Sequence, residues 1–91
     1  MYVKFYTKQF QKSFNKFLHS GKIKRSDIDL TIDMLASGAS LDPTYKDHAL
    51  HGEYYGYREC HIHGNILLVY KIERQKLVLV LFDLGSHSKL F

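Results

Sequence analysis

The sequence predicts an α+β fold, in which an N-terminal strand and a two-helix hairpin pack on an antiparallel sheet. Apolar residues recur at helical spacing between residues 10 and 35, and the most apolar run, LVLVLF, covers residues 77–82. Helices that precede a series of hairpin-connected strands are typical of this class. The 91 residues suffice for one core, so we expect a single domain over residues 1–91.

The first part of the chain is predicted to form a short strand and two helices. Residues 3–5 alternate as a strand does, and Thr7 can then cap a helix that Gly21 ends. The apolar positions of this helix follow helical spacing: Phe10, Phe14, Phe17 and Leu18. Ser26 and Asp29 form a plausible capping box for the second helix. Its buried positions should be Ile28, Ile32 and Leu35.

The last third is predicted to contain three strands, over residues 57–63, 66–72 and 77–83. Gly64-Asn65 indicates a two-residue hairpin between the first two, and residues 73–76 form a polar second turn. The middle strand is apolar on both faces, as expected of a central strand.

Pairing these strands predicts which side chains share a face. A two-residue loop places His63 opposite Ile66 and His61 opposite Leu68, and the second turn then places Asp83 opposite Ile66. One face should carry polar and aromatic side chains: Tyr57, Glu59, His61, His63, Tyr70 and Asp83. The other face should be mostly core: Arg58, Cys60, Ile62, Leu67 and Val69.

Two further segments can bring histidine to the polar face. Residues 39–56 show neither helical nor strand periodicity, and a loop this long in a small domain is usually functional or disordered. It holds His48, so we favour function. The tail GSHSKLF places His87 just after the last strand and ends in Phe91.

The positive charge is concentrated near the start of the chain. The formal net charge is +4, yet residues 1–26 contain no acid, and Lys8, Lys12 and Lys16 form a row at i+4 spacing on the exposed side of the first helix. This block suggests an anionic partner, nucleic acid before membrane, and a solvated helix face is the alternative.

Composition predicts a soluble protein of a reducing cytoplasm. Lysines interrupt the N-terminal stretch, so it does not read as a signal peptide, and the longest apolar run is too short to cross a bilayer. Cys60 is the only cysteine, which excludes an internal disulfide and a cysteine-rich zinc site.

The histidines can be read as metal ligands, as an acid–base apparatus or as polar residues at a sheet edge. A His-x-His strand can bind zinc, but the spacing is not specific and no nearby carboxylate is clearly a ligand. Near neutral pH an imidazole suits proton transfer, and beside lysines and aromatic side chains this favours metal-free RNA cleavage. For His19 and His51 we expect a structural role only.

Four motifs resemble the YafQ branch of the RelE-type bacterial toxins. They are YKDHAL at 45–50, GYRECHI at 56–62, LLVYKI at 67–72 and GSHSKLF at 85–91, in the family's order and spacing. The resemblance covers the whole chain. It implies a fold like that of microbial ribonucleases and cleavage of messenger RNA in the ribosomal A site, with no cofactor and no metal.

The resemblance also implies site residues and partners. Catalytic residues map by motif onto His48, His61, His87 and Phe91, and RNA or ribosome contacts are expected from the basic side chains Lys8, Lys12, Lys16, Lys46 and Arg58. The expected partners are a RelB- or DinJ-like antitoxin, the ribosome with its mRNA, and operator DNA only through the antitoxin complex. No membrane partner is expected.

Two positions depart from the family pattern. Asn65 stands where an active-site aspartate is usual, and Asp83 replaces an arginine at the end of the last strand. An amide cannot carry a proton, and an aspartate cannot neutralise a phosphate. Either activity is reduced, or His63 and Asp83 take over part of the work. The leading hypothesis is a ribosome-dependent endoribonuclease toxin, and the alternative is a catalytically weak module that acts by antitoxin binding and autoregulation of transcription.

Overall fold

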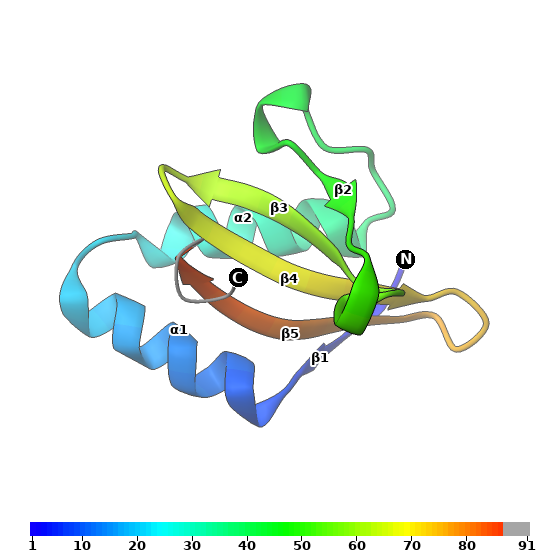
Figure 1. Cartoon of the computed structure of the whole chain (residues 1–91), viewed down its shortest axis with the longest axis horizontal. Coiled ribbons are helices and arrows are strands. Elements are labelled where there is room, and N and C mark those ends of the chain that lie inside the picture. Colours follow the sequence, from blue (N-terminus) through cyan, green and yellow to red (C-terminus); the bar gives the residue numbers. More distant parts are fainter. Residues whose placement is uncertain (87–91) are drawn as a thin grey trace.

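The structure, a computed structural model, describes residues 1–86 and contains two α-helices and a five-stranded sheet (Figure 1). The α-helices are α1 (Lys8–Ser20) and α2 (Arg25–Ala36). The strands are β1 (Val3–Tyr6), β2 (His48–Ala49), β3 (Arg58–His63), β4 (Ile66–Glu73) and β5 (Val78–Ser86). The predicted α+β class is therefore confirmed.

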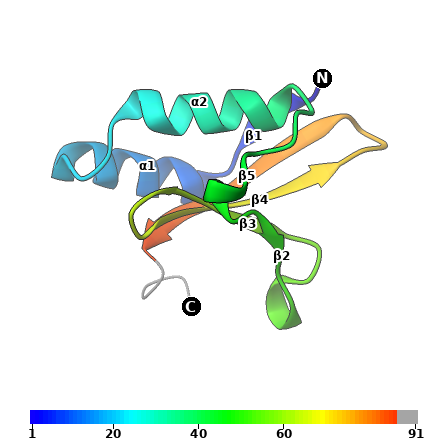
Figure 2. The same ribbon diagram turned by 90° about the horizontal axis from the view of Figure 1, so that it is seen from above.

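Both α-helices lie on one face of the sheet, and the other face is free of α-helices within the described residues (Figure 2). The strand order is β1-β5-β4-β3-β2. All neighbours are antiparallel except β1 and β5, which run parallel with Val3 opposite Val78. No helix within residues 1–86 is long and apolar enough to span a bilayer. We call the two faces of the sheet the helix face and the open face.

The local signals of α1 are confirmed, whereas the capping box of α2 is wrong. The Thr7 hydroxyl oxygen accepts a hydrogen bond from the backbone N–H of Phe10 at 3.0 Å, and Gly21 ends the helix in the left-handed region at φ 71°. The second helix instead begins at Arg25, after an N-cap Lys24 that makes no side-chain cap. Ser26 is therefore already inside the first turn.

The core lies between the helices and the sheet. The predicted α2 positions Ile28, Ile32 and Leu35 are buried in it, as is Phe10 of α1, while Phe14 and Phe17 pack against it partly buried. The sheet contributes the buried side chains Cys60, Ile66, Leu68, Tyr70, Leu79, Leu81 and Leu84.

Two register shifts change the predicted faces of the sheet. His63 lies opposite Ile66 as predicted, but an irregularity follows, so that His61 pairs with Leu67 and Glu59 with Val69. Between β4 and β5, Glu73 pairs with Val78, and a second shift separates the Tyr70–Leu81 and Val69–Asp83 pairs.

As a result, one residue leaves the predicted histidine face and two others join it. Tyr70 belongs to the core on the helix face, together with Cys60. Leu67 and Val69 move the other way and lie on the open face with His61 and Glu59, because paired residues point to the same side of a sheet. The single extra residue in each shift reverses the alternation beyond it.

The long segment before β3 is more ordered than predicted. It contains the 3₁₀ turns Pro43–Tyr45 and Gly52–Tyr54, with β2 between them at the edge of the sheet. Because β2 pairs with β3, His48 lies directly opposite Glu59. This short ladder positions the candidate site.

Candidate active site on the open face of the sheet

A histidine–carboxylate pair forms the centre of the site. His48 Nε2 lies 3.2 Å from Oε1 of Glu59, across the β2–β3 ladder. The His48 side chain is half exposed, whereas that of Glu59 is only 4% exposed. The second carboxylate oxygen of Glu59, Oε2, is buried and has no hydrogen-bond partner within residues 1–86.

A hydrogen bond to the backbone orients the His48 ring. Its Nδ1 lies 2.7 Å from the backbone carbonyl oxygen of Lys46, which can only accept, so Nδ1 is the donor. This leaves Nε2 as the ring nitrogen that faces the Glu59 carboxylate, with which it forms an ion pair when the ring is protonated. The pair therefore places a group suited to proton transfer beside a carboxylate at a partly exposed position.

His61 lies on the same face, one alternation along β3 from Glu59. It is half-buried and pairs with Leu67 of β4. The structure therefore brings together two of the predicted site residues, His48 and His61, with Glu59 between them.

His63 does not join this group. It pairs with Ile66, whose side chain lies in the core on the helix face, and it is exposed at the end of the hairpin. The prediction that His61 and His63 share a face is therefore wrong, because the irregularity at Ile62 reverses the alternation.

Asn65 lies in the turn after β3, at the mouth of a shallow cavity of about 320 Å³ between the hairpin and α1. Gly64 precedes it at φ 56°, which the first position of a type II′ turn requires.

Aromatic side chains border the site on the open face. The rings of Tyr57 and Phe82 lie 4.9 Å apart between centroids, and Tyr54 contacts Phe82 edge-on at 6.5 Å. The ammonium group of Lys71 lies 5.3 Å from the centre of the Tyr57 ring. A cation above an aromatic surface suits a base and its phosphate.

Among the described residues, Asp83 forms its side-chain hydrogen bonds with α1 and with the backbone of β5. Its carboxylate accepts hydrogen bonds from the Ser13 hydroxyl at 2.7 Å, from the Gln9 amide at 3.4 Å and from the backbone N–H of Leu84. The side chain is thus turned towards α1, at the part of the β5 edge that β1 does not cover. These contacts lend no support to a part for Asp83 in the chemistry, which stays a prediction.

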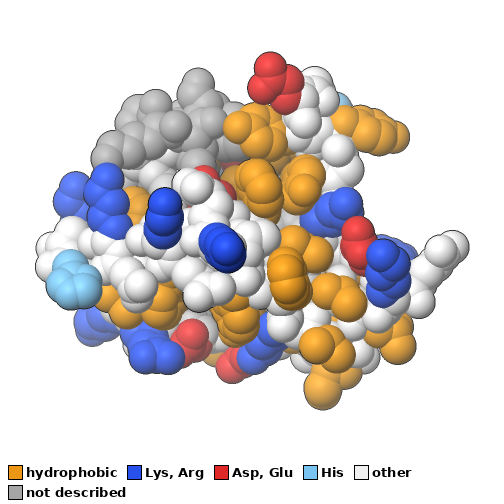
Figure 3. All heavy atoms as spheres, turned by 90° about the horizontal axis from the view of Figure 1, so that it is seen from below, with side chains coloured by type: hydrophobic (Ala, Val, Ile, Leu, Met, Phe, Trp, Pro, Cys, Tyr) orange, Lys and Arg blue, Asp and Glu red, His pale blue; other side chains and the backbone are white. Residues whose placement is uncertain are grey.

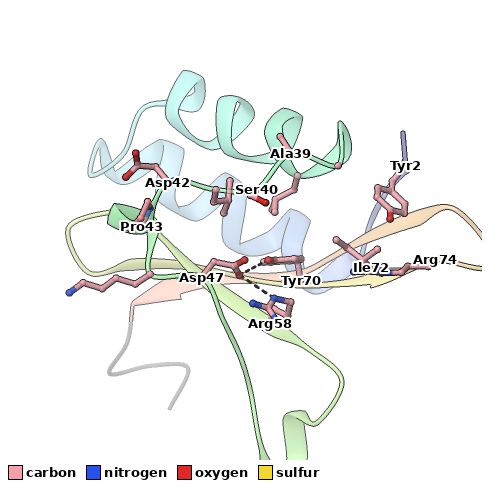
Figure 4. A pocket seen from close by; sticks show the side chains of 14 residues that line it. Tyr2, Ala39, Ser40, Asp42, Pro43, Asp47, Arg58, Tyr70, Ile72 and Arg74 are labelled. Carbon is pink, nitrogen blue, oxygen red and sulfur yellow. Dashed lines mark hydrogen bonds and ion pairs between the residues drawn. The ribbon is translucent and has the colours of Figure 1, made fainter.

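A second polar cluster lies behind the site, on the helix face. The Tyr70 hydroxyl donates to Oδ1 of Asp47 at 2.5 Å, and Nε of Arg58 donates to the same oxygen at 3.3 Å. These side chains line a cavity of about 510 Å³ below the segment that follows α2 (Figure 4). Lys46 and Arg58, both predicted to contact RNA, line this cavity on the helix face.

Burial shifts the ionisation of two groups on the helix face. Burial and then the hydrogen bond to Asp47 raise the pKa of Tyr70 well above its ordinary value. Burial, with smaller contributions from the Asp47 and Glu59 charges, raises the pKa of the Cys60 thiol to about 12. Both groups therefore stay neutral near pH 7.

The basic row and the tail complete the list of predicted residues. Lys8, Lys12 and Lys16 are exposed, and Figure 3 shows Lys and Arg side chains gathered over the surface that α1 forms. His87 and Phe91 lie outside the described residues. Among residues 1–86, no group of three or more His, Cys, Asp or Glu side chains is placed to hold a metal ion.

The profile of the family described as "Bacterial toxin of type II toxin-antitoxin system, YafQ" matches residues 2–91. The chain belongs to this family. In sequence it is 38% identical over 52 residues to the mRNA interferase toxin YafQ of Escherichia coli, a match that covers 56% of this chain and 53% of that protein. The chain spans between 39% and 53% of the length of the curated relatives it matches.

Two solved structures extend the likeness over the whole fold. A copper-bound mutant toxin from Helicobacter pylori is 40% identical, with full coverage of both chains and a TM-score of 0.91. The Escherichia coli DinJ-YafQ complex contains a chain that is 25% identical, with 100% of this chain and 99% of that one covered and a TM-score of 0.87. The predicted family is therefore confirmed.

Glu59 is a member of the site that the sequence of this YafQ-family chain does not single out. The sequence predicts Glu59 on the histidine face but gives it no partner. The signal that could have found it is the ECH motif itself, in which a carboxylate alternates with His61 along one strand. The pairing with His48 could not be read from the sequence, because a two-residue strand gives no periodicity.

Proposed function

We propose that this toxin is a ribosome-dependent endoribonuclease that cleaves mRNA in the ribosomal A site and so inhibits translation. The observation that carries the proposal is the His48–Glu59 pair, which lies on the same open face as His61. The Escherichia coli relative, named an mRNA interferase toxin, supports the same reaction class.

The proposed chemistry needs proton transfer and no metal ion. A base removes the proton from a 2′-hydroxyl, the oxygen attacks the adjacent phosphorus, and an acid protonates the leaving 5′-oxygen. We assign these two roles to His48 and His61 of the open face, together with His87 of the tail. Glu59 is a positioning residue, because it contacts His48 and is too buried to reach RNA.

The surroundings of the pair fit a single-stranded RNA. Tyr57 and Phe82 offer ring faces to an unstacked base, Lys71 supplies a nearby charge, and Phe91 is expected to join them on the strength of its motif. Lys8, Lys12 and Lys16 are proposed to contact ribosomal RNA phosphates through α1. Lys46 and Arg58 lie on the helix face, so any contact they make with the ribosome would be separate from the scissile bond.

We propose an antitoxin of the DinJ kind as the protein partner, since a YafQ chain of this fold is found in complex with DinJ. Operator DNA would be bound only through that complex. The site of action would be the cytoplasm, where ribosomes translate.

The test is to map RNA 5′ ends after the toxin is induced without an antitoxin, and to repeat the mapping on free RNA. New ends at one position within translated codons, absent from free RNA and from a His48→Ala strain, are expected. Ends that appear equally on free RNA would exclude ribosome dependence, and no new ends would exclude cleavage.

A second candidate is a catalytically weak toxin that acts mainly by antitoxin binding and transcriptional autoregulation. It is favoured by Asn65, which cannot carry a proton, and by Asp83, which is engaged with α1 instead of supplying a positive charge. Growth separates the two candidates. Induction alone should arrest cells if the enzyme is active, whereas continued growth together with repression of a promoter by the toxin–antitoxin complex would favour the second.

A further inference from the structure

The cavity beside Asn65 belongs to a groove that runs between α1 and the ends of β4 and β5. The cavity of about 320 Å³ is lined by Lys16, Lys22 and Asn65, together with Phe17, Ser20 and Ile66. A neighbouring cavity of about 190 Å³ shares Lys16 and Phe17 and extends along β5 to Asp83. Because they share these two lining residues, the two cavities lie next to each other along α1, and together we call them the groove.

The two ends of this groove differ in charge. At one end, Asp83 directs its carboxylate to Ser13, Gln9 and the backbone of β5. At the other end, Lys16 and Lys22 flank a neutral carboxamide, and no acidic side chain is among the described residues that line it. An anion is therefore attracted to the Asn65 end and repelled from the Asp83 end.

We propose that the Asn65 end of this groove binds a backbone phosphate of the RNA strand, next to the nucleotide that is cleaved. The proposal rests on the proposed RNA-cleaving function and adds a subsite to it. Lys16 and Lys22 supply the charge, and the Asn65 amide N–H donates a hydrogen bond to a phosphate oxygen. The groove reaches Ser86, the last described residue of β5, and so borders the position from which the His87-bearing tail continues.

The neutral side chain at position 65 is the specific requirement of this subsite. An aspartate there would place a negative charge beside both lysines and would take the position of the bound anion. An amide keeps both lysines free for phosphate and adds a donor. Asn65 is therefore assigned to RNA binding and not to proton transfer.

The test compares Asn65→Asp with Asn15→Asp. Both changes lower the net charge by one, but Asn15 is exposed on the other side of α1, beside Phe14 and Arg25. Binding of a short single-stranded RNA with 2′-O-methyl groups, which cannot be cleaved, is measured by fluorescence anisotropy at several salt concentrations. Cleavage on programmed ribosomes gives kcat and KM for the same proteins.

Asn65→Asp should weaken binding by about five- to tenfold, as expected for a unit-charge repulsion near a protein surface. The slope of the logarithm of the binding constant against the logarithm of the salt concentration should become shallower by about 0.7, because one phosphate contact is lost. KM should rise while kcat stays the same, and Asn15→Asp should change affinity by less than about twofold. Lys22→Gln should weaken binding as Asn65→Asp does, from the opposite wall and without altering the turn.

Equal effects of Asn65→Asp and Asn15→Asp, while the unmodified toxin still cleaves mRNA on ribosomes, would overturn the subsite and leave the proposed function standing. A higher kcat for Asn65→Asp would also overturn it, because position 65 would then be a site of proton transfer. If the unmodified toxin cleaves nothing, the proposed function fails and the subsite fails with it.

Discussion

The ladder between β2 and β3 places two charged pairs back to back on opposite faces of the sheet. On the helix face, Asp47 accepts hydrogen bonds from both Arg58 and Tyr70. On the open face, the residues that follow Asp47 and Arg58 in sequence form the His48–Glu59 pair, in which one buried carboxylate oxygen has no partner among the described residues. Neighbouring residues thus build a carboxylate with two hydrogen bonds on one face and a carboxylate with an unpaired oxygen on the other.

This difference separates a structural role from a functional one. The Asp47 side chain is 25% exposed and accepts hydrogen bonds from two side chains of the sheet, so it holds the segment before β2 against the sheet. An incompletely paired carboxylate is costly in a folded protein and is found where a ligand or a reaction uses it. The helix-face cluster should therefore govern stability, and the open-face pair should govern activity.

The sharpest contrast is expected from neighbouring substitutions at positions 47 and 48. His48→Ala should lower cleavage on programmed ribosomes by about a hundredfold or more, the usual scale for a lost acid or base, and leave the thermal midpoint nearly unchanged. Asp47→Ala should do the reverse and cost about 1–3 kcal/mol of unfolding free energy, because the Tyr70 hydroxyl loses its acceptor. If both variants lose similar amounts of stability, the two faces do not divide stability and activity between them.

Glu59→Gln tests whether the open-face carboxylate positions His48 or merely fills space. The neutral amide cannot stabilise a protonated His48 ring, so we expect cleavage to fall by about tenfold and its pH profile to change shape. The free energy of unfolding, measured with urea, should stay the same or rise, because a buried charge has been removed. An unchanged pH profile would show that Glu59 does not act through His48.

Tyr70→Phe should act on stability alone and should do so in a pH-dependent way. Near pH 7 the loss of the hydroxyl should cost about 1 kcal/mol, measured by urea unfolding. The pKa of Tyr70 is raised in the folded protein, so its contribution is complete below the ordinary tyrosine pKa of about 10 and is lost as the pH rises further. Stability should therefore fall between about pH 10 and 12 in the unmodified protein, and less steeply in Tyr70→Phe. If the free energy of unfolding falls equally steeply with pH in both proteins, another group causes the loss of stability at alkaline pH.

The smallest expected effect is the low reactivity of the Cys60 thiol in the folded protein. This thiol is fully buried on the helix face, and its pKa is raised to about 12. Modification by a thiol reagent at pH 8 should proceed only as fast as the protein opens, and addition of urea below the midpoint should accelerate it. Rapid modification of the folded protein would show that the helix face opens without global unfolding.

Predictions from the sequence succeeded where the signal was local. The Thr7 cap, the Gly21 stop, the buried stripe of α2 and the Gly64-Asn65 hairpin all depend on residues within a few positions of each other. The capping box of α2 failed because a Ser-x-x-Asp pattern is common and tertiary packing decides where a helix begins.

The faces of the sheet could not be derived, because one extra residue reverses every assignment beyond it. The shifts at Ile62 and Phe82 carry no distinctive residue types. They moved Tyr70 into the core and separated His63 from His61. The family resemblance nevertheless identified His48 and His61, because motif order does not depend on register.

The parallel pairing of β1 with β5 has a consequence for how the fold forms and opens. It joins residues that are 75 positions apart, Val3 and Val78, through a strand of four exposed residues. Closing so long a loop costs chain entropy. The contacts of a short, poorly buried strand can offset this cost only after the rest of the sheet has formed. β1 should therefore dock last during folding, and its amide protons should exchange with solvent before those of β4.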